Sequence, residues 1–195
     1  MKALAVSGSP RTNGNTTTLI RMVTDELESH GVETELVQLA GRKVAGCIAC
    51  YRCFSQKNGR CAVTDDAFNE IFEKMTAADA VILGTPTYVA DLTPEVKAII
   101  DRGTLVSGAN GGLLKRKLGA AVVAVRRAGS IHAFDSINHF FTINQMIIPG
   151  SSYWNLGIGR EKGEVTGDDE GVRTMKTLGE NIAWLLERIV DHPGS

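Results

Sequence analysis

Five apolar runs rich in β-branched residues alternate along this 195-residue chain with five stretches in which apolar residues recur at helical spacing. Each run ends in a cluster of Gly, Pro, Ser or Thr, which is typical of repeated strand–helix units. The expected strands are residues 2–6, 33–38, 80–83, 119–125 and 145–148, and the expected helices are about 15–29, 65–75, 94–101, 131–142 and 168–191. Runs such as 80–83 and 119–125 are apolar almost throughout, which indicates strands buried on both faces. The pattern predicts an α/β fold, a doubly wound five-stranded parallel sheet with helices on both sides.

The overall composition limits the environment and the partners of the chain. Its length and its 43% hydrophobic content suit one domain, and we expect residues 1–195 to form a single domain. No stretch approaches the roughly 20 apolar residues that cross a bilayer, so we expect a soluble, cytoplasmic protein with no membrane partner. The 21 basic and 22 acidic residues nearly balance, which argues against a nucleic-acid partner.

All four cysteines lie in one loop, residues 47–61, as Cys47, Cys50, Cys53 and Cys61 in a C-x2-C-x2-C-x7-C pattern. Two-residue gaps let neighbouring thiolates converge on one centre, and four sulfurs complete either a tetrahedral zinc site or a [4Fe-4S] cube. Ordinary buried cysteines would be scattered, and a reducing compartment disfavours disulfides. The loop therefore predicts a metal or cluster site. The long gap before Cys61 leaves zinc or free thiols open as alternatives.

The cysteines lie in a stretch without acidic residues, from Leu36 to Thr64. Its five cations are Arg42, Lys43, Arg52, Lys57 and Arg60. They would offset the negative charge of a thiolate-bound cluster or present a basic patch to an acidic redox partner. The alternative is a solvated loop that is basic without function.

The segment that follows the first expected strand, residues 7–18, combines small residues, hydroxyl groups and one cation, Arg11. Small residues let the backbone wrap an anion, and the N-terminus of the next helix adds the positive end of its dipole. The segment lacks the Gly-Lys-Ser/Thr of a P-loop and the G-x-G-x-x-G of a dinucleotide fingerprint. We therefore expect a phosphate monoester here, the alternative being a plain helix cap rich in Ser and Thr.

In order along most of the chain, these motifs resemble those of the flavodoxin-like iron-sulfur flavoproteins within the NADPH-dependent FMN reductase family. The motifs are Ser7-Gly8-Ser9-Pro10-Arg11, Gly14-Asn15-Thr16, the four cysteines, Gly84-Thr-Pro-Thr-Tyr88, Lys97 and Asp101-Arg102. The resemblance implies a sheet order of 2-1-3-4-5, an FMN phosphate held by Ser9, Arg11, Asn15, Thr16 and Thr17, and a [4Fe-4S] cluster on the four cysteines. It also implies a homodimer or homotetramer in which the cluster of one subunit approaches the flavin of another.

Two later loops are expected to hold the flavin ring. In the first, Pro86 makes a rigid turn, Tyr88 stacks on or edges the ring, and the N–H groups of Thr87 and Tyr88 meet its nitrogens and carbonyls. The alternative is a surface tyrosine with no ligand. In the second loop, Gly129 gives flexibility, and an arginine near the pyrimidine edge would stabilise negative charge that develops on reduction. We assign this role to Arg127, although the sequence leaves open which arginine of the adjacent pair faces the ring.

Two long segments have no assigned element. Residues 103–117 contain four glycines and are expected to form a mobile connection, either a lid or a subunit contact. Residues 149–167 are expected to be irregular, with Tyr153 and Trp154 at a subunit interface rather than in an acceptor pocket. We place His132, at the start of a helix, outside the site.

Three functions fit these features. The preferred one is a flavin-dependent oxidoreductase that passes electrons between a [4Fe-4S] cluster, FMN and a small acceptor such as a quinone, dioxygen or peroxide, with ferredoxin or NAD(P)H as donor. Its chemistry would be carried by the flavin, with Tyr88 and Arg127 in support. The second is an NAD(P)H-dependent FMN or quinone reductase without a cluster, its thiols free or zinc-bound. The third is a regulatory sensor whose cysteines respond to oxidants.

Overall fold

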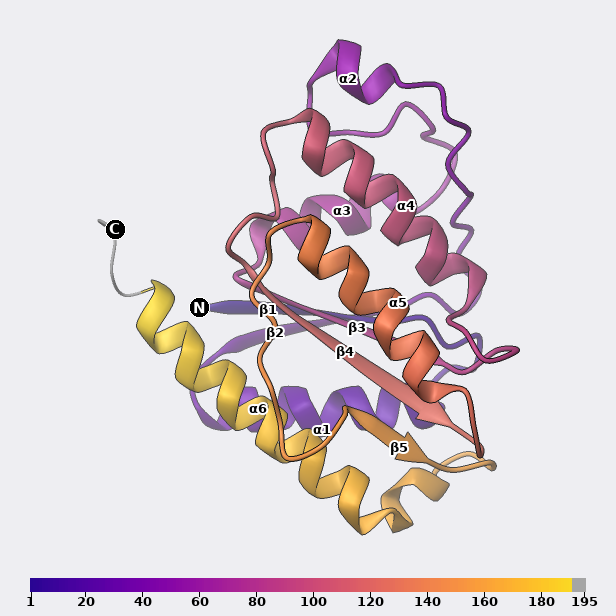
Figure 1. Cartoon of the computed structure of the whole chain (residues 1–195), viewed down its shortest axis with the longest axis vertical. Helices are drawn as coiled ribbons and strands as arrows, with labels where there is room; N and C mark the ends of the chain where they lie inside the picture. Colours follow the sequence, from indigo (N-terminus) through magenta and orange to yellow (C-terminus); the bar gives the residue numbers. More distant parts are fainter. Residues whose placement is uncertain (191–195) are drawn as a thin grey trace.

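A five-stranded parallel sheet forms the centre of the computed structural model, which describes residues 1–190 (Figure 1). The strands are β1 (Lys2–Ser7), β2 (Glu33–Gln38), β3 (Ala80–Pro86), β4 (Leu118–Val125) and β5 (Leu156–Ile158). Their order is β2-β1-β3-β4-β5, and every neighbouring pair is parallel. The predicted fold class and strand order are therefore confirmed.

The helices cover both faces of the sheet. They are α1 (Asn15–Ser29), α2 (Arg52–Gln56), α3 (Phe68–Ala77), α4 (Pro94–Ala109), α5 (Ser130–Ile143), the 3-10 turn η1 (Glu164–Gly167) and α6 (Asp169–Val190). Helices α1 and α6 cover one face, and α3, α4 and α5 cover the other (Figure 1). Alternate residues of β1 serve the two cores, because Leu4 packs with the α3–α5 layer and Ala5 with the α1–α6 layer.

The last strand is not where the sequence predicted it. Residues 145–148 make only one isolated bridge, from Ile147 to Leu118 at the start of β4. Strand β5 instead pairs Leu156, Gly157 and Ile158 with the end of β4. An added Cβ at Gly157 would lie 2.6 Å from Leu19 of α1, so the close approach of this edge strand to the helix requires glycine.

One other prediction of local structure was wrong, and one short helix was not predicted. Residues 103–109, expected in a mobile connection, instead continue helix α4 to Ala109. Gly103 lies within this helix, where an added Cβ would be 3.3 Å from the Phe140 ring. The short helix α2 was not foreseen, since it lies within the cysteine loop. Helix α6 follows the expected course from residue 169 onward, and its predicted end at residue 191 lies outside the described residues. Within residues 1–190, no helix has the length and apolar character needed to span a bilayer.

Candidate active site

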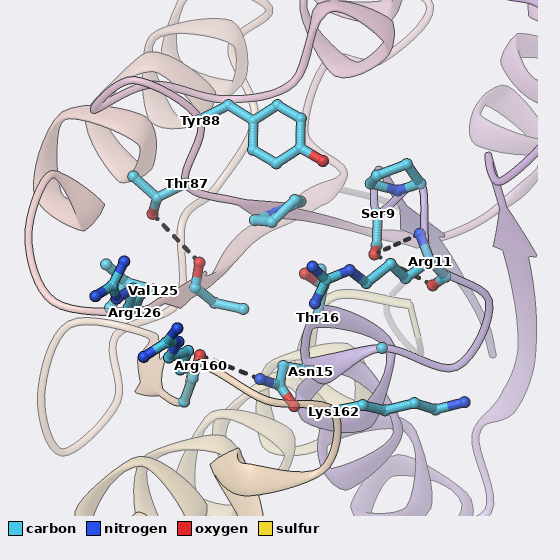
Figure 2. A pocket seen from close by; sticks show the side chains of 15 residues that line it. Ser9, Arg11, Asn15, Thr16, Thr87, Tyr88, Val125, Arg126, Arg160 and Lys162 are labelled. Atoms are coloured by element: carbon cyan, nitrogen blue, oxygen red, sulfur yellow. Dashed lines mark hydrogen bonds between the residues drawn. The ribbon is translucent and has the colours of Figure 1, made fainter.

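The carboxyl ends of β1, β3, β4 and β5 surround one cavity (Figure 2). This is the place where parallel α/β sheets bind ligands, since the loops leaving the strands diverge there. The lining residues are Ser9, Pro10, Arg11, Gly14, Asn15 and Thr16 after β1, Pro86, Thr87 and Tyr88 after β3, Ala124, Val125 and Arg126 from β4, and Gly159, Arg160 and Lys162 after β5.

The N-terminus of α1 opens into this cavity without a cap. Gly14 is the residue before the helix, and no side chain bonds the first N–H groups. The hydroxyl of Thr16, in the first turn, is buried and has no hydrogen-bond partner in the protein. The uncapped N–H groups need an acceptor, which water or a ligand supplies, and a buried hydroxyl without a partner is costly. Together they fit a phosphate group, whose oxygens accept several hydrogen bonds.

The turn before α1 is ordered by its own polar groups. Ser9 Oγ accepts from the N–H of Arg11 at 3.1 Å, and the Gly14 N–H donates to the Arg11 carbonyl at 3.2 Å. The Gly8 N–H donates to Gly84 of β3 at 2.7 Å, which fixes the loop against the sheet. The loop is thus preformed, and the Arg11 side chain reaches across the cavity (Figure 2).

Two residues expected at the phosphate have other tasks in the structure. Asn15 lines the cavity, but its side chain holds the loop after β5: Nδ2 donates to the carbonyls of Gly159 and Glu161, and Oδ1 accepts from the Gly163 N–H at 2.7 Å. The Thr17 side chain is not brought to the cavity, because its hydroxyl pairs with Ser7 Oγ at 2.9 Å.

The loop after β3 forms a tight turn beside the cavity. The N–H groups of Thr87 and Tyr88, which we expected to meet a ring, bond within the protein: Thr87 donates to the Ala124 carbonyl at 2.9 Å and Tyr88 to the Asp91 carbonyl at 2.7 Å. Val89 and Ala90, between Tyr88 and Asp91, have positive φ angles of 48° and 62°. The Tyr88 ring is half-exposed and faces the cavity (Figure 2).

The loop after β4 supplies Arg126 to the cavity and not Arg127. Both arginines are exposed, and neither is paired with a carboxylate within residues 1–190. Gly129 lies behind this loop with φ at +90°, and a Cβ there would approach Ala90 Cα to 2.6 Å. Gly129 therefore lets the loops after β3 and β4 pack directly on each other.

Sequence reasoning missed the contribution of the loop after β5, namely Gly159, Arg160 and Lys162. The lining does come from loops at the strand ends, but the fifth strand lies at residues 156–158 and not at the predicted 145–148. With β5 at its observed position, the two cations fall next to the cavity. Tyr153 and Trp154 are half-exposed and lie outside its lining.

A second cavity is lined by Cys47, Cys50, Cys53 and Cys61, with Arg102, Leu105 and Val106 of α4 on its inner wall. Cys47 and Cys50 are exposed and Cys53 is buried. Burial raises the pKa of the Cys53 thiol, partly offset by nearby backbone N–H groups. All four cysteines line this cavity, and no three His, Cys, Asp or Glu residues between 1 and 190 are close enough together to hold a metal ion.

The cations around the cysteines are largely paired with acids of α3 and the residues before it. Arg42 contacts Glu70 at 3.3 Å, Lys43 contacts Asp65 at 2.6 Å, and Arg60 contacts Glu73 at 3.1 Å. Arg52 and Lys57 make no such ion pair within the described residues. Because acids distant in sequence fold beside it, the basic stretch gives a weaker basic surface than its composition suggested.

A sequence profile of the NADPH-dependent FMN reductase family matches residues 1–161. The chain belongs to this family. The protein is therefore an FMN-dependent flavoprotein and a flavin-dependent oxidoreductase.

Relatives of known sequence match this chain over nearly their whole length. An iron-sulfur flavoprotein of Methanocaldococcus jannaschii is 35% identical over 196 residues, covering 97% of this chain and 99% of the relative. An iron-sulfur flavoprotein of Methanosarcina thermophila is 34% identical over 191 residues, covering 97% of each chain. Among solved structures, RosB with a bound formylriboflavin phosphate intermediate matches with a TM-score of 0.79 at 21% identity, over 99% of this chain and 81% of that one, which supports the fold.

Proposed function

We propose that this FMN reductase family protein binds FMN with its phosphate on the loop between β1 and α1. The observation that carries the proposal is the buried, unpaired Thr16 hydroxyl beside an uncapped helix N-terminus. Ser9, Arg11 and Asn15 line the same part of the cavity. When bound, the flavin supplies redox chemistry in two-electron or one-electron steps.

The flavin ring would lie between the loops after β3 and β4. Pro86, Thr87 and Tyr88 offer an apolar and aromatic wall, and Gly129 keeps the facing loops close. Of the two adjacent arginines, Arg126 is the one that lines the cavity, so we assign to it the role first given to Arg127. Its charge would favour negative charge on the reduced ring.

We further propose a [4Fe-4S] cluster on Cys47, Cys50, Cys53 and Cys61. Support comes from the names of the relatives, from the four thiols lining one cavity, and from thiolate being the ligand such clusters use. The cluster cavity and the flavin cavity share no residue. Helix α2 and the flavin loops also lie on separate parts of the molecule (Figure 1).

That separation supports a homo-oligomer in which the cluster of one copy approaches the flavin of another. Ferredoxin or NAD(P)H would be the donor, and a quinone, dioxygen or peroxide the acceptor. A second candidate, an NAD(P)H-dependent FMN or quinone reductase with free or zinc-bound thiols, is favoured by the exposure of Cys47 and Cys50 and by the absence of a gathered ligand set in residues 1–190.

Anaerobic reconstitution tests both cofactors. Chain purified without oxygen and supplied with iron, sulfide and FMN is expected to hold one flavin and about four irons per chain. One flavin with zinc or no metal would select the second candidate. Failure to bind FMN at high concentration would refute the proposal as a whole.

Thr16→Val is expected to weaken FMN binding about tenfold, because a hydrogen bond to a charged phosphate contributes roughly 1.5 kcal/mol. The free energy of unfolding without FMN should stay unchanged or rise, since the variant removes a buried hydroxyl that has no partner. Fluorescence titration with FMN and denaturant unfolding measure the two quantities.

The matched control is Thr18→Val, in the same turn of α1, whose hydroxyl bonds the Gly14 carbonyl and not the cavity. FMN affinity should be little changed in this variant. Equal losses in the two variants would show that Thr16 does not contact the phosphate.

Arg126→Gln is expected to lower the midpoint potential of bound FMN and to weaken binding roughly fivefold or less, because a partly exposed charge is screened by water. Arg127→Gln, one residue along the same loop, should leave both quantities near wild type, since Arg127 does not line the cavity. Spectroscopic redox titration of the two variants decides the assignment, and the reverse ranking would return the role to Arg127.

A further inference from the structure

Arg102 of α4 is a fully buried guanidinium behind the cysteine cavity. It is 1% exposed, and its side chain stacks 4.0 Å over the ring of Phe68. Each of its nitrogen atoms has an acceptor: Nε donates to Cys61 Sγ at 3.3 Å, Nη1 to the Ala45 carbonyl at 2.9 Å and to Asp66, and Nη2 to the Val63 carbonyl at 2.9 Å and to Asp66. One side chain thus joins the two ends of the cysteine loop.

The orientation of the Arg102–Asp66 ion pair decides which charge faces Cys61. The Asp66 carboxylate accepts from the two terminal nitrogens, while the Nε edge points at the Cys61 sulfur. Burial raises the pKa of Asp66, but hydrogen bonds from Arg102 and from the Ala45 and Phe68 N–H groups outweigh burial and hold it below its usual value. The pair is therefore ionised, with its positive edge next to the sulfur and its negative edge turned away.

A second residue, which is uncharged, holds the backbone of Cys61. Asn69 of α3, itself buried, accepts from the Cys61 N–H at 2.8 Å and donates to the Cys61 carbonyl at 2.9 Å. Cys47 and Cys50, in contrast, lie on an exposed segment with left-handed residues at Ala49 and Tyr51. The cysteine loop is accordingly rigid at Cys61 and open at its first two thiols.

We propose that Arg102 is a positioning residue for the cluster: it holds Cys61 Sγ in place and supplies the fixed positive charge that sets the cluster's reduction potential. The proposal rests on the [4Fe-4S] assignment in the proposed function. Hydrogen bonds to ligand sulfurs and nearby positive charge stabilise the more negative reduced cluster and so raise its potential.

The test compares three variants of the whole chain after anaerobic reconstitution, with iron per chain and the cluster midpoint potential as readouts. The double variant Arg102→Gln with Asp66→Asn removes the cation without leaving a buried carboxylate unpaired. Arg102→Lys keeps the charge. Asn69→Ala loosens the Cys61 backbone without changing any charge.

The double variant is expected to bind less iron and to shift the cluster to a lower potential. Arg102→Lys should restore the potential toward wild type, and Asn69→Ala should lose iron while the remaining clusters keep the wild-type potential. A double variant with wild-type potential and full iron would overturn the role of Arg102 and leave the cluster assignment in place. A wild-type chain that takes up FMN but no iron would overturn the cluster assignment, and this proposal with it.

Discussion

Arg102→Met should lower the free energy of unfolding by about 3–5 kcal/mol, the range found when one partner of a buried ion pair is removed. The loss is large because Asp66 would keep a buried charge, the Ala45 carbonyl would lose its Arg102 donor, and the Val63 carbonyl would keep only Asn69 as a donor. Urea unfolding of the metal-free protein measures the effect apart from any cluster.

Arg42→Met is the matched control, because Arg42 also pairs with an acid of the α3 region but lies partly exposed, as does its partner Glu70. Exposed pairs contribute at most about 1 kcal/mol. Similar losses of unfolding free energy in the two variants would mean that the hydrogen bonds of Arg102 do not hold the two ends of the cysteine loop together.

Gly129→Ala is expected to cost about 2–5 kcal/mol of stability and to weaken FMN binding. A left-handed backbone costs an L residue about 1–2 kcal/mol, and forcing extra volume into a packed contact adds a cost of about 1–3 kcal/mol. The contact here is with the backbone of Ala90, 2.6 Å from the added Cβ, so the turn that presents Tyr88 must move.

Gly111→Ala separates the two causes. Gly111 has a similar φ of +81°, but an added Cβ there meets nothing within 4 Å. This variant should show only the backbone cost and unchanged FMN affinity, measured by thermal unfolding and flavin titration. If both variants bind FMN alike, the packing of the two loops does not shape the ring site.

Local periodicity was enough to predict most of the architecture. Helix α1 and strand β2 have the bounds that the sequence indicated. The buried stripe of α1 follows directly from the helical spacing of its apolar residues. Strand β5 was misplaced because residues 145–148 are as apolar as a strand, while the real edge strand is three residues long and is defined by its pairing with β4.

The cavity at the strand ends followed from the same reasoning, but the direction of individual side chains did not. Adjacent residues on a helix point about 100° apart, so Thr16 and Thr17 look equivalent in sequence and only packing shows that one faces the cavity and the other Ser7. The same holds for Arg126 and Arg127 in the loop after β4.

The sequence by itself determined the parallel sheet, its helix layers, the loop of small and hydroxyl residues after β1 and the clustering of the thiols, because these depend on patterns within short segments. The tertiary structure alone decided that Arg102 is buried against Cys61, that acids of α3 pair with the basic stretch, and that Arg160 and Lys162 reach the cavity. Those contacts join residues far apart in the chain, and their energies arise only when the elements pack together.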